Sequence, residues 1–178
     1  MTCTDSHTAA CITRREFSAL AAAALLPRAA SAQTGAAPLI TRAIPSTGER
    51  LPAVGLGTAS VFNADDEQTQ RAASQVLQTL VGAGGRLVDT ASSYGGAESV
   101  LGSAIAAAAL RDKVFLATKL EAPDAAELQR SLAHLKMAKV DLLQLHNVSD
   151  PQQSLAQFKA WKAQGLCRYI GITSTYHG

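Results

Sequence analysis

Cysteine is scarce in this chain of 178 residues, which contains three. Cys3 and Cys11 lie in the first 32 residues, so Cys167 stands alone in the remainder, and one thiol excludes a disulfide framework. A large excess of charge of one sign is absent too, because the formal net charge is +2 for the whole chain and +1 once the first 32 residues are set aside. Such a balance gives no electrostatic reason to expect a nucleic-acid partner. Paired histidines or cysteines, which metal sites favour, are also missing.

No long apolar run is present either, and this bears on the first 32 residues. The stretch from Phe17 to Leu26 has ten residues, whereas a membrane-spanning helix needs about 20. Arg14 and Arg15 precede it and small residues follow it up to Ala32, which predicts a cleaved signal peptide over residues 1–32 and no stable membrane anchor. The arginine pair resembles the twin-arginine export signal, which implies a periplasmic or otherwise exported bacterial protein. A fortuitous amphipathic start is the alternative.

A linker over residues 33–38 precedes a single predicted domain over residues 39–178. Pro45-Ser46-Thr47-Gly48 predicts the turn of a small N-terminal β-hairpin. Helical spacing follows over residues 65–84, 97–110, 123–138 and 150–165, with short apolar strands between these segments. The first helix is expected to bury Ala72, Val76, Leu77 and Leu80, and Pro123 is expected near the first turn of the third. Strands and helices in alternation predict an α/β fold with a parallel sheet.

The predicted strands end on polar residues at regular intervals of 27 to 31 residues: Thr58, Asp89, Lys119, His146 and Ser174. Units of constant length with polar strand ends indicate a (β/α)₈ TIM barrel, of which about five strands are present, with its chemistry at the carboxyl ends of the strands. An open doubly wound sheet is the alternative. That fold normally has a G-x-G-x-x-G turn after its first strand, and "GLGTASVFNADD" lacks one.

Four ionisable side chains are expected to meet at this mouth: Asp89, Tyr94, Lys119 and His146. Each has an ordinary alternative, namely a helix cap, a surface aromatic, a solvated lysine and a core histidine. Together they suit carbonyl reduction. A free phenol, with a pKa of about 10, is a poor proton donor at neutral pH, but a neighbouring ammonium favours the phenolate, and a carboxylate holds the ammonium in place. An imidazole can orient the substrate oxygen, while the hydride must come from a cofactor.

These segments resemble the aldo-keto reductase family. "LVDTASSYGGAESVLG" is similar to that family's stretch with the catalytic aspartate and tyrosine, including Glu98 and Gly102. "VFLATK" is similar to its lysine strand, "LQRSLAHLKMAKVDLLQLHN" to its helix and histidine strand, and "YIGITS" to the strand whose serine contacts the nicotinamide. The resemblance implies that Tyr94 is the general acid, that Lys119 and Asp89 tune it, and that His146 positions a small carbonyl substrate. It further implies that Gly57, Thr58, Asp89 and Ser174 bind the cofactor, with NADPH expected and NADH as the alternative.

The family's barrel has eight strands, so the chain is expected to be an N-terminal fragment of a longer reductase, or else a half-barrel that pairs with another copy. Besides an enzyme, we consider an inactive fragment or a non-catalytic, nicotinamide-binding regulatory subunit. The presence of all four polar side chains favours the enzyme. A metal-dependent hydrolase that uses His146 and Asp89 is the remaining alternative.

Overall fold

The structure is a computed structural model that describes residues 38–147 and 151–174. The predicted signal peptide, and the linker up to residue 37, lie outside the described residues. Over the described part of the chain, no helix combines the length and the apolar character needed to cross a membrane.

The predicted hairpin is present at the start of the described chain. Strands β1 (Thr41–Ala43) and β2 (Arg50–Pro52) pair antiparallel, with Thr41 opposite Pro52. The turn between them uses Gly48 at a φ of 75°, a conformation that glycine adopts without a steric penalty.

The main sheet is parallel and has five strands in chain order. They are β3 (Gly55–Gly57), β4 (Leu87–Asp89), β5 (Phe115–Leu120), β6 (Val140–Leu145) and β7 (Cys167–Ile172). Thr58 and His146 follow their strands directly, Asp89 and Lys119 lie at strand ends, and Ser174 comes two residues after β7. The α/β prediction is confirmed, and because the strands are parallel, all these polar residues lie at one edge of the sheet.

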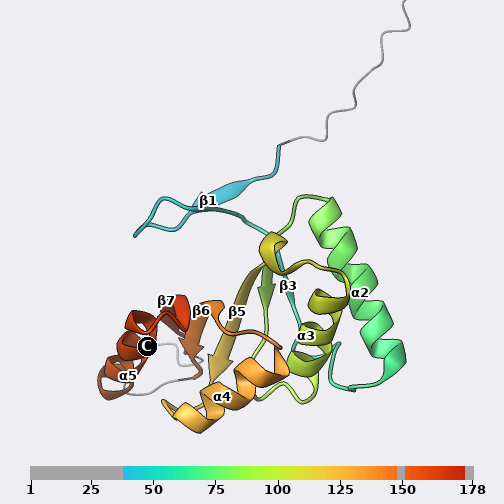
Figure 1. Ribbon diagram of the computed structural model, residues 1–178. Helices are drawn as coiled ribbons and strands as arrows, with labels where there is room; N and C mark the ends of the chain where they lie inside the picture. Colours follow the sequence, from blue (N-terminus) through green and yellow to red (C-terminus); the bar gives the residue numbers. More distant parts are fainter. Residues whose placement is uncertain (1–37, 148–150, 175–178) are drawn as a thin grey trace, which may run out of the picture. The chain divides into compact units, whose positions relative to one another are not determined.

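A helix follows each of the first four strands of this sheet (Figure 1). The helices are α2 (Glu67–Gly82), α3 (Ala97–Ala107), α4 (Ala125–His134) and α5 (Pro151–Ala163), with a short 3₁₀ turn, η1 (Arg111–Lys113), before β5. The predicted segments are therefore helical. One detail was wrong, because helix α2 buries Ala73 and Leu77 while Ala72 and Val76 are exposed. Helix α4 begins at Ala125 behind the capping carboxylate of Asp124, so Pro123 lies just before the first turn, near its predicted place.

The hydrophobic core lies between the helices and one face of the sheet. Because side chains alternate along a strand, every second strand residue points to the helices; these include Val88, Leu116, Leu120, Leu143 and Leu145, all buried. Phe158 and Trp161 of α5 belong to the same core, with ring centroids 5.1 Å apart, and so does Cys167. The opposite face carries the residues that alternate with these, Asp89, Lys119 and Gln144 among them.

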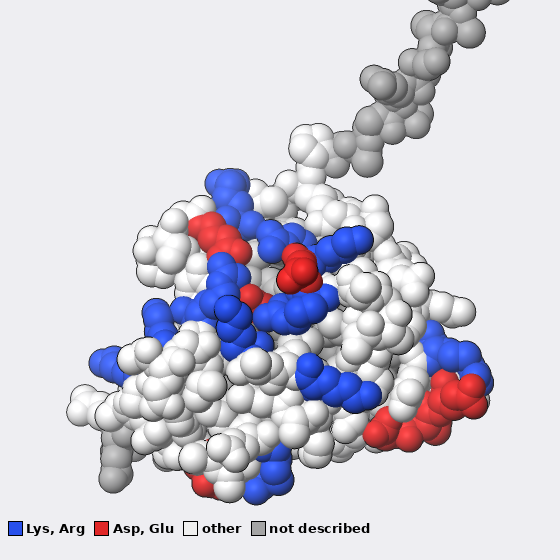
Figure 2. All heavy atoms as spheres, in the orientation of Figure 1, with Lys and Arg blue, Asp and Glu red and all other residues white. Residues whose placement is uncertain are grey.

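The hairpin is tied to the beginning of β7 by polar contacts. Tyr169 donates its hydroxyl to Glu49 at 2.7 Å, and Arg168 forms ion pairs with Glu49 and with Asp141. Asp141 is buried and also accepts a hydrogen bond from Arg111 at 3.1 Å and one from the backbone N–H of Leu116 at 2.9 Å. Figure 2 shows Lys and Arg side chains gathered around a few acidic ones near the hairpin. This cluster stabilises the end of the sheet that lies away from the predicted site.

Candidate active site

Asp89 and Lys119 form the centre of the site. The Lys119 Nζ lies 2.5 Å from Asp89 Oδ2 and donates to the backbone oxygen of Thr90 at 2.8 Å. The lysine side chain is 8% exposed and the aspartate side chain 38% exposed. An ammonium this deeply buried needs a counter-charge, and adjacent strands supply it because β4 and β5 pair in register with Asp89 opposite Ala117.

Tyr94 lies beside this ion pair, in the loop between β4 and α3. Its ring centroid is 5.0 Å from Lys119 Nζ and 5.9 Å from the His146 ring, which it meets edge-on at 79°. The loop is held by the Ser92 N–H, which donates to Lys119 O at 3.0 Å, and by the Gly96 N–H, which donates to Asn63 O at 3.1 Å. A Cβ at Gly96 would lie 2.9 Å from that oxygen, so glycine permits the close approach. The structure thus brings all four predicted side chains to one rim.

His146 has a partner that the sequence did not predict. Its Nδ1 lies 2.6 Å from Oε1 of Glu121, in the loop after β5. The imidazole is 14% exposed and the Glu121 side chain 48%. Burial raises the pKa of Glu121, but hydrogen bonds from Ser93 and His146 and the nearby positive charge outweigh it, and the net effect lowers that pKa. The carboxylate is therefore ionised at neutral pH.

The residues predicted to bind the cofactor surround the same rim but differ in exposure. The Thr58 side chain is fully buried and its hydroxyl donates to the backbone oxygen of Asp89 at 3.1 Å, so it holds β3 to β4. Gly57 and Ser174 are exposed, and a Cβ at Gly57 would meet open space. Oδ1 of Asp89 has a long contact of 3.5 Å with Gln144 Nε2. The Asp89 side chain is 38% exposed, and Gly57 lies opposite Asp89 on the neighbouring strand β3.

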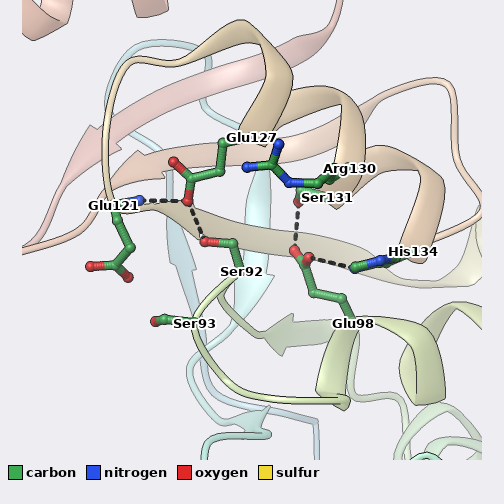
Figure 3. Close-up of a pocket in the computed structure, with 8 residues that line it drawn as sticks. All are labelled: Ser92, Ser93, Glu98, Glu121, Glu127, Arg130, Ser131 and His134. Atoms are coloured by element: carbon green, nitrogen blue, oxygen red, sulfur yellow. Dashed lines mark hydrogen bonds and ion pairs between the residues drawn. The ribbon is translucent and has the colours of Figure 1, made fainter.

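A pocket of about 190 Å³ adjoins the rim (Figure 3). It lies between the loops after β4 and β5 and helix α4, with Ser93, Glu121 and Arg130 among its lining residues. Glu98 is buried at its base, where it accepts hydrogen bonds from Thr118 at 2.7 Å and Ser131 at 2.6 Å. Across the described residues, no group of three or more His, Cys, Asp or Glu side chains is placed to hold a metal ion.

Three polar residues of the site were missed from the sequence: Glu121, Glu127 and Gln144. Glu127 of α4 accepts from the backbone N–H groups of Glu121 at 2.9 Å and of Ala122 at 3.2 Å, and from the Ser92 hydroxyl at 2.6 Å. A signal for two of them exists in the alternation of strand side chains, since Glu121 is two residues after Lys119 and Gln144 two before His146. Glu127 stands three residues after the helix cap Asp124, a spacing typical of a helix start, but this spacing does not indicate its contacts with Glu121 and Ser92.

Comparison with known proteins decides the family. The sequence profile described as "Aldo/keto reductase family" matches residues 53–178. The chain belongs to the aldo-keto reductase family. The chain is 34% identical over 155 residues to an aldo-keto reductase from Mycolicibacterium smegmatis, covering 81% of this chain and 51% of that protein. It is 36% identical over 135 residues to the methylglyoxal reductase DkgA of Yersinia pestis, covering 70% of this chain and 46% of that protein.

Solved aldo-keto reductases share the fold of this chain. The thermostable aldo-keto reductase Tm1743, crystallised with the inhibitor epalrestat, matches with a TM-score of 0.66 and 28% identity over 75% of this chain and 53% of that one. An aldo-keto reductase from Klebsiella pneumoniae in complex with NADPH matches with a TM-score of 0.64 and 27% identity over 75% of this chain and 50% of that one. The five-stranded sheet therefore corresponds to part of the family's TIM barrel. The chain spans about half the length of the curated relatives it matches.

Proposed function

We propose that this aldo-keto reductase reduces an aldehyde or ketone to the alcohol with a nicotinamide cofactor, and that Tyr94 is the general acid. The observation that carries the proposal is the Tyr94 ring, 5.0 Å from the ammonium of a buried Lys119 that Asp89 holds at 2.5 Å. A phenol beside a fixed positive charge is stabilised as the phenolate that remains after proton transfer. Family membership supports the same chemistry.

In this proposal the residues of the rim handle the substrate oxygen and its proton. A bound reduced nicotinamide supplies the hydride that the carbonyl carbon requires. Tyr94 gives its phenolic proton to the carbonyl oxygen, which completes the alcohol, and the phenolate regains a proton from solvent. Lys119 stabilises the phenolate, Asp89 holds Lys119, and His146 orients the carbonyl oxygen. The buried ion pair costs nothing to reorganise during the reaction, because its partners are already in place.

Asp89, Gly57, Thr58 and Ser174 are the residues that we propose for the nicotinamide site. Asp89 Oδ1 would accept from the ribose, Gly57 leaves space beside it, and Thr58 holds β3 against β4. NADPH is the expected cofactor because solved relatives contain NADP or NADPH, and NADH is the alternative. The proposed substrate is a small carbonyl compound; methylglyoxal belongs in the first panel because a relative is named for its reduction.

Replacing Tyr94 by phenylalanine in the full-length protein tests the role of the phenol. General acid catalysis contributes about 10²- to 10⁴-fold, so we expect a loss of kcat of that size in carbonyl reduction. Tyr169→Phe is the matched control, since its hydroxyl contacts Thr47 and Glu49 on the hairpin, and it should leave reduction unchanged. Undiminished reduction by Tyr94→Phe would refute the proposal.

The alternative function, a non-catalytic barrel that binds nicotinamide, predicts a different pair of results. Such a protein would bind NADPH and turn over no carbonyl in the panel, and Tyr94→Phe would change neither result. Equilibrium dialysis with NADPH and NADH, run beside the activity assay, separates the two functions. Asp89→Asn should weaken nucleotide binding if Asp89 contacts the ribose.

We propose further that residues 1–32 export the protein by the twin-arginine route. The support is the sequence alone, namely Arg14 and Arg15 ahead of a short apolar stretch and small residues up to Ala32. Fusing these residues to a reporter and replacing both arginines by lysine tests the proposal. Export that persists after the double replacement, or an exported product that still begins before Ala32, would contradict it.

A further inference from the structure

The contact between His146 and Glu121 determines which ring nitrogen carries a proton. A neutral imidazole has one N–H donor and one acceptor nitrogen, whereas an ionised carboxylate can only accept. Oε1 of Glu121 lies 2.6 Å from Nδ1 of His146. Since hydrogen bonds and nearby positive charge keep Glu121 ionised despite its partial burial, the proton of this short contact belongs to Nδ1. That leaves Nε2 as the ring nitrogen available to a substrate.

The carboxylate of Glu121 is held in place by the surrounding loops. The Glu127 carboxylate fixes the backbone at Glu121, because it accepts hydrogen bonds from the N–H group of Glu121 at 2.9 Å and from that of Ala122 at 3.2 Å. The Ser92 hydroxyl ties Glu127 to the loop that precedes Tyr94, at 2.6 Å. Figure 3 shows this arrangement, with the Glu121 side chain directed away from Glu127. The partner of His146 is therefore supported from α4 and from the loop that carries the proposed general acid.

We infer that Glu121 is a positioning residue that holds His146 as the Nδ1–H form, so that the substrate oxygen meets Nε2. The inference deepens the proposed function and rests on it, because it assigns a role in binding the substrate oxygen. Glu121 does not touch the reacting atoms itself.

In this arrangement the charge of the His146 ring determines whether the site suits an alcohol or a carbonyl compound as the substrate. When the ring is neutral, Nε2 has a lone pair and accepts a hydrogen bond, which suits the hydroxyl of an alcohol substrate. When the ring is protonated, Nε2–H donates, which suits a carbonyl oxygen. The charged or titratable groups around the ring are Glu121 at 2.6 Å, Tyr94 with its ring at 5.9 Å, and the ion pair of Lys119 with Asp89 behind Tyr94.

The tautomer is tested by ¹⁵N NMR of the histidine rings in the purified full-length protein, a measurement that needs no turnover. The His146 resonances are assigned by their absence in His146→Gln. At a pH where the ring is neutral, we expect the Nδ1–H form of His146. In Glu121→Gln the amide can donate to Nδ1, so the Nε2–H form should appear. A wild-type His146 ring that is neutral and carries its proton on Nε2 would overturn the inference.

Kinetics test the consequence for catalysis. While the His146 ring is protonated, we expect Glu121→Gln to lower kcat/KM for carbonyl reduction by about 10- to 100-fold, the cost typical of removing the hydrogen-bond partner of a metal-binding histidine. In the wild type, kcat/KM for carbonyl reduction should fall with rising pH as the His146 ring loses its proton, because Nε2 then has no hydrogen to donate. In Glu121→Gln this fall should flatten, because a neutral ring can then donate from Nε2. A purely structural role would lower activity at every pH without changing the profile.

Glu67→Gln is the matched control for the loss of one carboxylate. Glu67 is at the start of α2, where its side chain is 83% exposed and pairs with Arg71, so this variant should keep both the tautomer and the pH profile. If Glu121→Gln kept the wild-type tautomer of His146 and the wild-type pH profile, the role inferred for Glu121 would be contradicted, while the proposed function would stand. Unchanged activity in Tyr94→Phe would instead contradict the proposed function, so the two failures are distinguishable.

Discussion

Replacing Gly102 by alanine tests how closely α3 and α4 must approach to support the site. Gly102 lies within α3, and a Cβ at this position would be 2.5 Å from His134 O and 2.6 Å from the carbonyl carbon of Leu135. Real Cβ atoms essentially never lie within 3.0 Å of another heavy atom. The neighbouring atoms are backbone, so no side chain can rotate to make room. The two helices must therefore separate.

The expected cost follows from two opposing effects. Adding a methyl group to a well-packed interior costs about 1 to 3 kcal/mol, and occasionally more; contact with backbone places Gly102→Ala at or above the upper end. Alanine is favoured over glycine within a helix by about 1 kcal/mol. We therefore expect a net loss of about 2 kcal/mol in the free energy of unfolding. For a protein of this size, that corresponds to a Tm lower by about 4 to 8 °C.

Gly82→Ala provides the matched control. Gly82 is also a helical residue, the last of α2, and a Cβ there would have no neighbour within 4 Å. The same substitution should thus leave stability unchanged or raise it by up to about 1 kcal/mol. Urea denaturation followed by circular dichroism measures both variants. Because α4 also carries Glu127, Gly102→Ala should loosen the loop at Glu121. A Gly102→Ala protein as stable as the wild type would refute the packing argument.

Three further predictions concern single groups. The hydrogen bond from Tyr169 holds the pKa of Glu49 below its usual 4.5 and outweighs the opposing effect of burial, and Arg168 lowers that pKa further. The stability that Glu49 contributes is therefore present above pH 4.5 and is lost as pH falls through its pKa in the folded state. Glu49→Gln should therefore lower stability at pH 7 and reduce its acid sensitivity, as urea titrations at pH 7 and pH 3 would measure. Burial raises the pKa of Cys167 to about 11. With Cys3 and Cys11 replaced by serine, a thiol reagent at pH 8 should therefore modify the native protein far more slowly than the unfolded one, and equal rates would contradict the burial of Cys167. The buried Thr90 hydroxyl has no hydrogen-bond partner among the described residues, so Thr90→Val should keep or raise stability by about 1 kcal/mol; a clear loss in thermal melting would oppose this.

The order of the elements could be predicted because its signals are local. Apolar spacing identified the four α-helices from α2 to α5, and polar residues marked the strand ends within two positions. The face of α2 could not be predicted in the same way. Ala72 and Ala73 are adjacent and equally apolar, and the packing of α2 against α3 buries Ala73 and leaves Ala72 exposed.

The residues that the strand ends contribute to the candidate site could be predicted from the sequence, whereas the contacts between side chains could not. Asp89, Lys119 and His146 follow or end neighbouring parallel strands, so topology alone places them at one edge. The contact of the buried Thr58 side chain had no signal in the sequence. Because β3 pairs with β4, its hydroxyl lies within hydrogen-bond distance of the backbone oxygen of Asp89.

The sequence by itself determined the α/β class, the succession of strands and helices, and the polar residues that end the strands. These depend on side-chain periodicity along a few consecutive residues, which the chain displays before it folds. Only the tertiary structure decided that Glu121 holds His146, that Glu127 holds Glu121, and that Gly102 gives α4 its place. Those contacts join residues whose distance in space is set by the register of the strands and the path of the loops, and neither leaves a local pattern in the sequence.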